Sequence, residues 1–288
     1  MVDAAPTLRW LPGDHAADFS PAGIVEGVRR FREPVHIVRG GSGYEPGLGF
    51  GGRPITTDRG YELLGALPGL YPEWLGDRSF NHTHNVRFPY VAGEMANGIA
   101  TVASVVAMAR ARMLGFFGAA GLPMAEVEQA VAELRRSLPG QDNWGVNLIH
   151  SPAEPGREEH LAELLIRAGV PRVSASAYLE LTPAVVRCAV AGLRPEAGGV
   201  ARARHLFAKV SHPEVATRFL SPAPPDILRG LVERGQITGD EADLAARVPL
   251  AEDVTVEADS GGHTDNRPLG VVLPVIAALR DELTRRHG

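Results

Sequence analysis

Short apolar runs alternate with longer helical stretches along most of the chain after residue 88. Six runs have the length and side chains of strands, at residues 88–92, 113–117, 145–149, 171–177, 205–210 and 253–257. The stretches between them have the periodicity or capping residues of helices, at residues 99–112, 124–138, 158–168 and from Thr182 onward. Strands that alternate with helices predict βαβ units and a parallel sheet. Six successive units without a glycine-rich first turn for a dinucleotide favour an α/β barrel of the TIM (β/α)8 type over a doubly wound sheet.

One segment interrupts this alternation between the fifth and sixth predicted strands. Residues 222–225 are rich in proline, and Thr238 followed by Glu241 is a capping-box pattern that begins a helix. We therefore expect a helical hairpin insertion over residues 222–248, either as a lid or docking surface or as a passive addition. A last helix is predicted over residues 269–286, so the expected barrel is C-terminally incomplete, with about six βα units.

The first 80 residues differ from the rest of the chain. Residues 39–52 are dense in glycine, and apolar runs such as residues 35–38 are short. The glycine run lacks the Gly-Lys-Ser/Thr ending of a phosphate-binding loop. We expect an irregular N-terminal segment over residues 1–80 that packs on a barrel formed by residues 81–288.

Composition narrows the class of protein. A hydrophobic content of 44% and a charged content of 22% are ordinary for a soluble globular chain. The net charge of −5 leaves no basic stripe, which argues against nucleic acid as the main partner. The single cysteine, Cys188, excludes a disulfide within the chain. The apolar stretch 95–109 is bounded by Glu94 and Arg110 and is too short to cross a membrane, so we expect a cytoplasmic protein.

The sixth predicted strand ends in the most informative residues of the chain. Val254 and Val256 alternate with polar residues, and the strand then leads to Gly261, Gly262 and His263. In barrel enzymes the chemistry takes place at the carboxyl ends of the strands. Glycines there allow a flat cofactor to approach the main chain, and an imidazole titrates near neutral pH. The alternative interpretation is a surface histidine in a β-turn.

Other polar residues indicate a metal site or a catalytic pair only weakly. His82 and His84 have a spacing that can bind a metal, but two ligands without a third define no site. His150 and Ser151 are adjacent, so they do not predict a nucleophile and its base. Asp265 and Arg267 fit a salt bridge within a loop. We therefore predict neither a metal site nor a hydrolase.

Several motifs that follow one another along the chain resemble a family of flavin enzymes. The two glycines and the histidine at residues 261–263 are similar to the signature of FMN-dependent nitronate monooxygenases and related flavin enoyl reductases. The longer run 254–268, together with stretches 90–100, 114–122 and 145–152, resembles one branch, the PfaD-type enoylreductases. These act in trans on polyunsaturated fatty acid synthases and trans-acyltransferase polyketide synthases. The resemblance extends from about residue 70 to the C-terminus.

The resemblance implies an FMN-binding barrel with the flavin at the carboxyl ends of the strands. It implies a catalytic role for His263, on the substrate side of the flavin ring. The implied cofactor-binding residues are Met95, Ala96, Asn97, Gly98, Asn147, Lys209, Glu257, Gly261 and Gly262. Lys209 is the only lysine of the sequence, and Asn147 lies in an apolar run where an unpaired amide would be costly. The alternatives are a solvated surface lysine, and an asparagine paired with backbone.

The resemblance also implies a reaction and its partners. The family reduces α,β-unsaturated acyl thioesters on an acyl carrier protein, with NADPH or NADH as electron donor and with synthase components as partners. It binds the FMN phosphate through loops after strands seven and eight, which come after the six strands predicted in this chain. Two alternatives stay open: a nitronate monooxygenase, and a barrel fragment that is inactive or complements another subunit. Neither an interaction with a membrane nor an oligomeric state is indicated.

Overall fold

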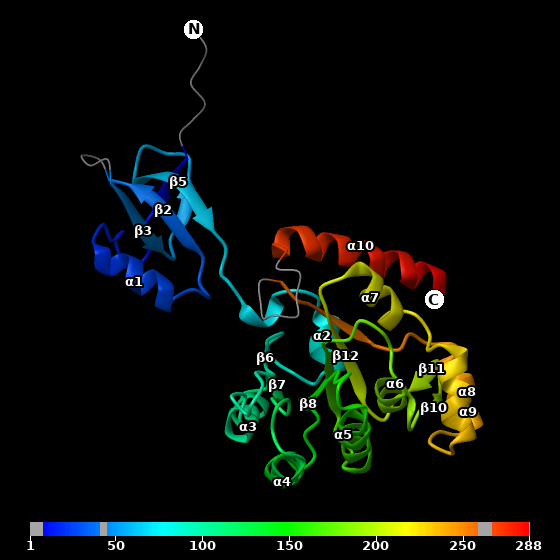
Figure 1. Ribbon diagram of the computed structural model, residues 1–288. Coiled ribbons are helices and arrows are strands. Elements are labelled where there is room, and N and C mark those ends of the chain that lie inside the picture. Colours follow the sequence, from blue (N-terminus) through cyan, green and yellow to red (C-terminus); the bar gives the residue numbers. More distant parts are fainter. Residues whose placement is uncertain (1–7, 41–44, 259–266, 288) are drawn as a thin grey trace. The chain divides into compact units, whose positions relative to one another are not determined.

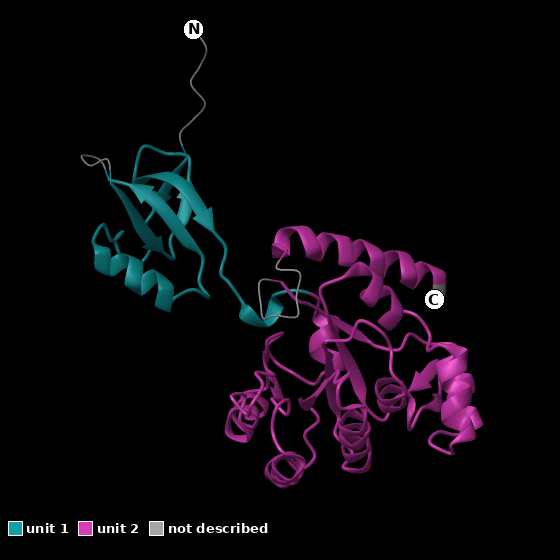
Figure 2. Cartoon of the chain, viewed as in Figure 1, with its two compact units in different colours: residues 1–76 teal, residues 77–288 magenta. Residues whose placement is uncertain are grey.

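The computed structural model describes residues 8–40, 45–258 and 267–287. The chain divides into two compact units, Met1–Gly76 and Asp77–Gly288 (Figure 2). Among the described residues, no helix has the length and apolar character needed to cross a membrane.

The first unit has a five-stranded antiparallel sheet in the order β3-β2-β5-β1-β4. Its elements are β1 (Arg9–Leu11), α1 (Pro21–Arg29), β2 (Val35–Arg39), β3 (Pro46–Phe50), β4 (Arg53–Ile55), β5 (Tyr61–Leu67) and η1 (Pro72–Trp74). Trp10 is fully buried, and its indole Nε1 donates to the carbonyl of Gly51 at 2.9 Å. A Cβ on Gly49 would lie 2.6 Å from the Trp10 ring, so this glycine gives the indole its space. The described part of the first unit therefore contains more regular structure than its glycine content indicates. The packing of residues 1–80 on the barrel stays a prediction.

The second unit is built on six parallel strands in the order β13-β12-β9-β8-β7-β6 (Figure 1). The strands are β6 (Val91–Gly93), β7 (Leu114–Phe117), β8 (Trp144–Ile149), β9 (Arg172–Ser176), β12 (His205–Val210) and β13 (Asp253–Val256). The helices that accompany them are α2 (Arg78–Thr83), α3 (Val102–Arg110), α4 (Met124–Ser137), α5 (Pro155–Arg167), α6 (Pro183–Val190), α7 (Pro213–Phe219) and α10 (Leu269–His287). The prediction of a barrel-type α/β fold with six βα units is confirmed.

The predicted insertion after the fifth strand of this sheet is also present. It consists of α8 (Pro225–Glu233) and α9 (Gly239–Ala245), both of which contact α6. Thr238 and Glu241 form the expected capping box at the start of α9. A short hairpin, β10 (Arg194–Glu196) and β11 (Gly199–Ala201), precedes β12. The insertion therefore packs on the helical layer of the fold.

The central strands are buried on both faces, as expected for a parallel sheet covered by helices. Leu148, Leu165 and Leu206 belong to the main apolar cluster between the sheet and its helices. Close packing within the sheet depends on Gly145 in β8. A Cβ there would lie 2.4 Å from the Phe116 ring and 2.5 Å from the carbonyl oxygen of Arg172.

This packing predicts the effect of one methyl group. We expect Gly145→Ala to lower the free energy of unfolding by about 1–3 kcal/mol, because neither the strand backbone nor the buried ring has room to move. Gly156→Ala is the matched control, since a Cβ at that position in α5 meets nothing within 4 Å. Urea unfolding of both variants measures the difference, and equal stabilities would contradict the packing argument.

Candidate functional site

An ionic cluster joins three strands at their carboxyl ends. Lys209, near the end of β12, places its ammonium Nζ 2.9 Å from Glu257 Oε1 and 3.4 Å from Glu94 Oε1. Glu257 directly follows β13, and Glu94 directly follows β6. In the sheet, β9, β8 and β7 lie between β12 and β6. The contact of Lys209 with Glu94 therefore crosses the inside of the sheet, which requires the sheet to be strongly curled.

Asn147 of β8 connects this cluster to β9. Its side chain is buried, and its amide Nδ2 donates to Glu94 Oε2 at 3.3 Å. The same amide lies 3.1 Å from the carbonyl oxygen of Ser174 and 2.9 Å from Ser176 Oγ, both on β9. These partners satisfy a buried amide that would otherwise be costly. The network thus spans the carboxyl ends of β6, β8, β9, β12 and the residue after β13.

Burial and pairing set the protonation of the cluster. Burial raises the pKa of Glu94, although Lys209 and Asn147 partly oppose this effect. Burial by itself lowers the pKa of Lys209, but its attraction to Glu94 and its bond to Glu257 outweigh burial and raise that pKa overall. The lysine is therefore a positive charge at neutral pH, and Glu94 holds a proton more readily than an ordinary glutamate.

A cavity of about 160 Å³ opens beside the cluster. Lys209 and Glu257 line it, together with Ala177, Tyr178, Leu179, Val210, Ser211, His212 and Val215. The Lys209 side chain is 23% exposed, so a ligand in the cavity can reach the ammonium. Ala177, directly after β9, has a left-handed backbone with φ of 63°. Such strain in a residue with a side chain is frequent at functional sites.

The loop after β6 carries four of the residues that the sequence points to. Met95 is 56% exposed, and Ala96 and Asn97 are exposed as well. Asn97 and Gly98 have left-handed backbones, and their amides donate to the carbonyls of Ala120 and Gly118 at 2.7 and 3.1 Å. The loop is therefore fixed by the loop after β7. It presents an exposed apolar side chain and backbone at the same end of the sheet as Lys209.

The structure brings together part of the predicted set. Asn147, Lys209 and Glu257 form one network, whereas Gly261, Gly262 and His263 lie outside the described residues. The roles assigned to all of them stay predictions. The sequence reasoning missed Glu94, which lies inside the motif 90–100 and directly follows a strand. A search for a carboxylate partner of the only lysine would have pointed to it.

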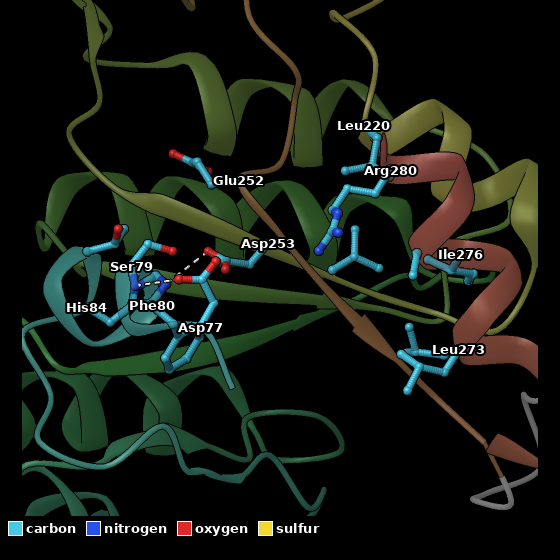
Figure 3. Close-up of a pocket in the computed structure, with 14 residues that line it drawn as sticks. Asp77, Ser79, Phe80, His84, Leu220, Glu252, Asp253, Leu273, Ile276 and Arg280 are labelled. Carbon is cyan, nitrogen blue, oxygen red and sulfur yellow. Dashed lines mark hydrogen bonds and ion pairs between the residues drawn. The ribbon is translucent and has the colours of Figure 1, made fainter. Parts of the chain in front are cut away.

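A larger cavity, of about 470 Å³, lies beside the start of β13 (Figure 3). Figure 3 shows Asp77, His84 and Asp253 on one side of it, and Leu273 and Ile276 of α10 on the other. His84 is bound at Nδ1 by Arg172 Nε and at Nε2 by Asp253 Oδ2, each at 3.0 Å. No group of three or more metal-ligating side chains occurs among the described residues. None of the predicted site residues that the structure describes lines this cavity. His84 pairs with Arg172 and Asp253 near the start of β13, at the opposite end of the sheet from Lys209.

The sequence of this chain is similar to those of several known proteins. No family model matches the chain. It is 48% identical over 215 residues to one of the polyunsaturated fatty acid synthase subunits of Thraustochytrium sp., a match that covers 74% of this chain and 14% of the relative. It is 41% identical over 289 residues to polyketide biosynthesis protein PksE of Bacillus subtilis, covering 98% of this chain and 36% of the relative. The chain therefore spans well under half the length of these curated relatives.

A solved structure is similar to this chain in both fold and sequence. The enoyl reductase domain of MlnA, from the macrolactin biosynthesis cluster of Bacillus amyloliquefaciens, matches with a TM-score of 0.70 and 35% identity. The match covers 74% of this chain and 48% of that chain. The resemblance to enoylreductases of polyunsaturated fatty acid and polyketide synthases, read from the sequence motifs, is confirmed by these relatives.

The raised pKa of Glu94 predicts a pH dependence of stability. The folded pKa lies above the ordinary value of 4.5, so its contribution to the free energy of unfolding is complete below that value. The contribution is lost as the pH rises through the folded pKa. We expect the stability of the wild type to fall relative to that of Glu94→Gln over this range, in urea unfolding at a series of pH values. Glu180→Gln, at an exposed carboxylate, should leave the wild-type slope unchanged, and parallel curves for Glu94→Gln would contradict the prediction.

Proposed function

We propose that this chain, a relative of the enoylreductases of polyketide and polyunsaturated fatty acid synthases, forms part of an FMN-dependent enoyl reductase. Its substrate is an α,β-unsaturated acyl thioester on an acyl carrier protein. The observation that carries the proposal is the Glu94–Lys209–Glu257 cluster, which sets a partly exposed cation beside a cavity at the carboxyl ends of the strands. This is the end at which barrel enzymes place their chemistry.

The described residues fit a flavin at this end of the sheet. A reduced flavin ring carries negative charge, and the ammonium of Lys209 is a cation that a ligand in the cavity can reach. The loop of Met95 and Gly98 offers an exposed apolar side chain and accessible backbone to a flat ring. Asn147 binds Glu94 and so supports the cation cluster at the same strand ends. These residues would hold the ring, together with Gly261 and Gly262 as the sequence resemblance implies.

The chain's own residues would orient the ligands and polarise the substrate, because a flavin supplies the redox chemistry. When bound, FMN provides the hydride that adds to the β-carbon of the thioester. Glu94 and Glu257 hold the Lys209 side chain from two sides, so the charge is in place before a ligand binds. The Lys209 side chain is only 23% exposed, so most of it is shielded from water. His263 is proposed to polarise the thioester carbonyl.

The partners follow from the same proposal. The electron donor is NADPH or NADH, and the acyl chain is delivered by a carrier protein of a polyketide or fatty acid synthase. Without oxygen, the flavin-loaded protein that contains this chain should oxidise more than one equivalent of nicotinamide only when a crotonyl thioester is present to reoxidise the flavin. Bound flavin without any thioester-dependent oxidation would refute the proposal. Oxygen uptake with alkyl nitronates in its place would identify a nitronate monooxygenase.

The role of the cation can be tested separately from turnover. Lys209→Met should weaken FMN binding roughly 10- to 100-fold, because a hydrogen bond to a charged group contributes about 1.5–3 kcal/mol. The quenching of flavin fluorescence on binding measures the affinity. Arg229→Met, which removes an exposed cation from α8, is the matched control and should bind FMN as the wild type does. Equal affinities of the two variants would show that Lys209 does not contact the flavin.

A further inference from the structure

A second polar network lies at the same end of the sheet, around the carboxylate of Glu158. This residue is in the first turn of α5, and its side chain is 3% exposed. Oε2 lies 3.0 Å from His150 Nδ1 and accepts from the amide of Ser151 at 3.3 Å. Oε1 accepts from the Tyr178 hydroxyl at 3.0 Å and from the Thr182 hydroxyl. Four donors around one buried carboxylate hold it firmly in place.

The network fixes the orientation of the His150 imidazole. Because the Glu158 carboxylate oxygen accepts, Nδ1 of the ring carries the proton between them. The ring also stacks on Tyr178, with centroids 5.1 Å apart and 28° between the planes. Nε2, on the other edge of the ring, is therefore directed away from Glu158. The side chain is 21% exposed, so it combines a buried carboxylate partner with access to solvent and ligands.

His150 is joined to the Lys209 cluster through Ser176. The His150 amide donates to the Ser176 carbonyl at 3.0 Å, and Ser176 Oγ accepts from Asn147, which binds Glu94. Tyr178, against which the imidazole stacks, lines the same cavity as Lys209 and Glu257. Ala177, which has a left-handed backbone, lies between Ser176 and Tyr178 in the sequence. The two networks are therefore neighbours at the carboxyl ends of β8 and β9, and Tyr178 belongs both to the Glu158 network and to the wall of the cavity.

A reductase of unsaturated thioesters needs an acid as well as a hydride. Addition of hydride at the β-carbon moves the electron pair of the C=C bond onto the thioester as an enolate. A C–H bond must then form at the α-carbon, with a proton from a positioned acid. A histidine whose second nitrogen is held by a carboxylate is suited to this, since the carboxylate stabilises the imidazolium.

We propose that His150, oriented by Glu158, is the acid that protonates the α-carbon; this rests on the function proposed above. The Nε2–H bond of the imidazolium breaks as the α-C–H bond forms, and its electron pair stays on Nε2. The hydride comes from the reduced flavin of that function, and solvent restores the proton. Glu158 is a positioning residue, because it acts through the imidazole. Tyr178 keeps its own proton, since burial and then Glu158 raise its pKa well above the ordinary value.

The decisive variant is His150→Asn, which keeps a side-chain donor near the position of Nδ1 and removes Nε2. It should slow reduction of the crotonyl thioester roughly 10²- to 10⁴-fold, the range typical of general acids. Reduction of the flavin by the nicotinamide should be unchanged. The wild-type rate of thioester reduction should fall as the pH rises, because the acid must carry a proton, and the variant should lose this fall. Binding of a non-reducible thioether analogue and the urea unfolding midpoint should stay at wild-type values.

Two further variants separate chemistry from architecture. Tyr178→Phe removes a different donor from the same carboxylate and should keep the wild-type pH dependence, whatever it does to stability. Glu158→Gln should weaken the pH dependence as His150→Asn does, and it replaces that variant if the latter does not fold. A wild-type rate and pH profile in His150→Asn, or in Glu158→Gln, would overturn the proposal. A wild-type protein that binds flavin but does not reduce the thioester would instead refute the proposed function itself.

Discussion

The second unit is organised around the charge of Lys209. An ammonium withdrawn from water is costly unless carboxylates and hydrogen bonds compensate it. Here the compensation comes from Glu94 and Glu257, which follow the strands at the two edges of the described sheet. The ion pairs can form only if the sheet curls until these ends approach each other. The curvature, the cavity beside Lys209 and the position of the loop after β6 are therefore linked by one electrostatic requirement.

Much of the fold follows from the sequence, because local patterns specify it. Alternation of strands and helices specified the parallel sheet, and the Thr238–Glu241 pair specified the start of α9. Asn147, Lys209 and Glu257 could be grouped because parallel strands end at the same edge of a sheet. The glycines of β3 are an exception, because their composition indicated irregular structure. No local pattern shows that Gly49 makes room for Trp10.

The interactions that the sequence reasoning missed are those between side chains of different helices, strands and loops. Glu94 lies within a recognised motif, but its importance depends on Lys209, with which it shares no sequence pattern. His150 beside Ser151 looked unproductive because its partner is neither neighbour but Glu158, on the next helix. Both pairs become visible only in the three-dimensional structure, since contacts between side chains of different elements follow no period along the sequence. The site thus combines a cation network and an imidazole–carboxylate pair, which meet at Ser176.

The composition of the chain gives Lys209 a further property. It is the only lysine among 288 residues, so it is the only side chain with an ε-amine. Amine-directed chemistry on the folded chain therefore has one internal target, and that target lies at the mouth of the cavity. The paired carboxylates keep the amine protonated and hence a poor nucleophile. A ligand or substitution that disturbs either ion pair would be registered as a change in the acylation rate of a single atom.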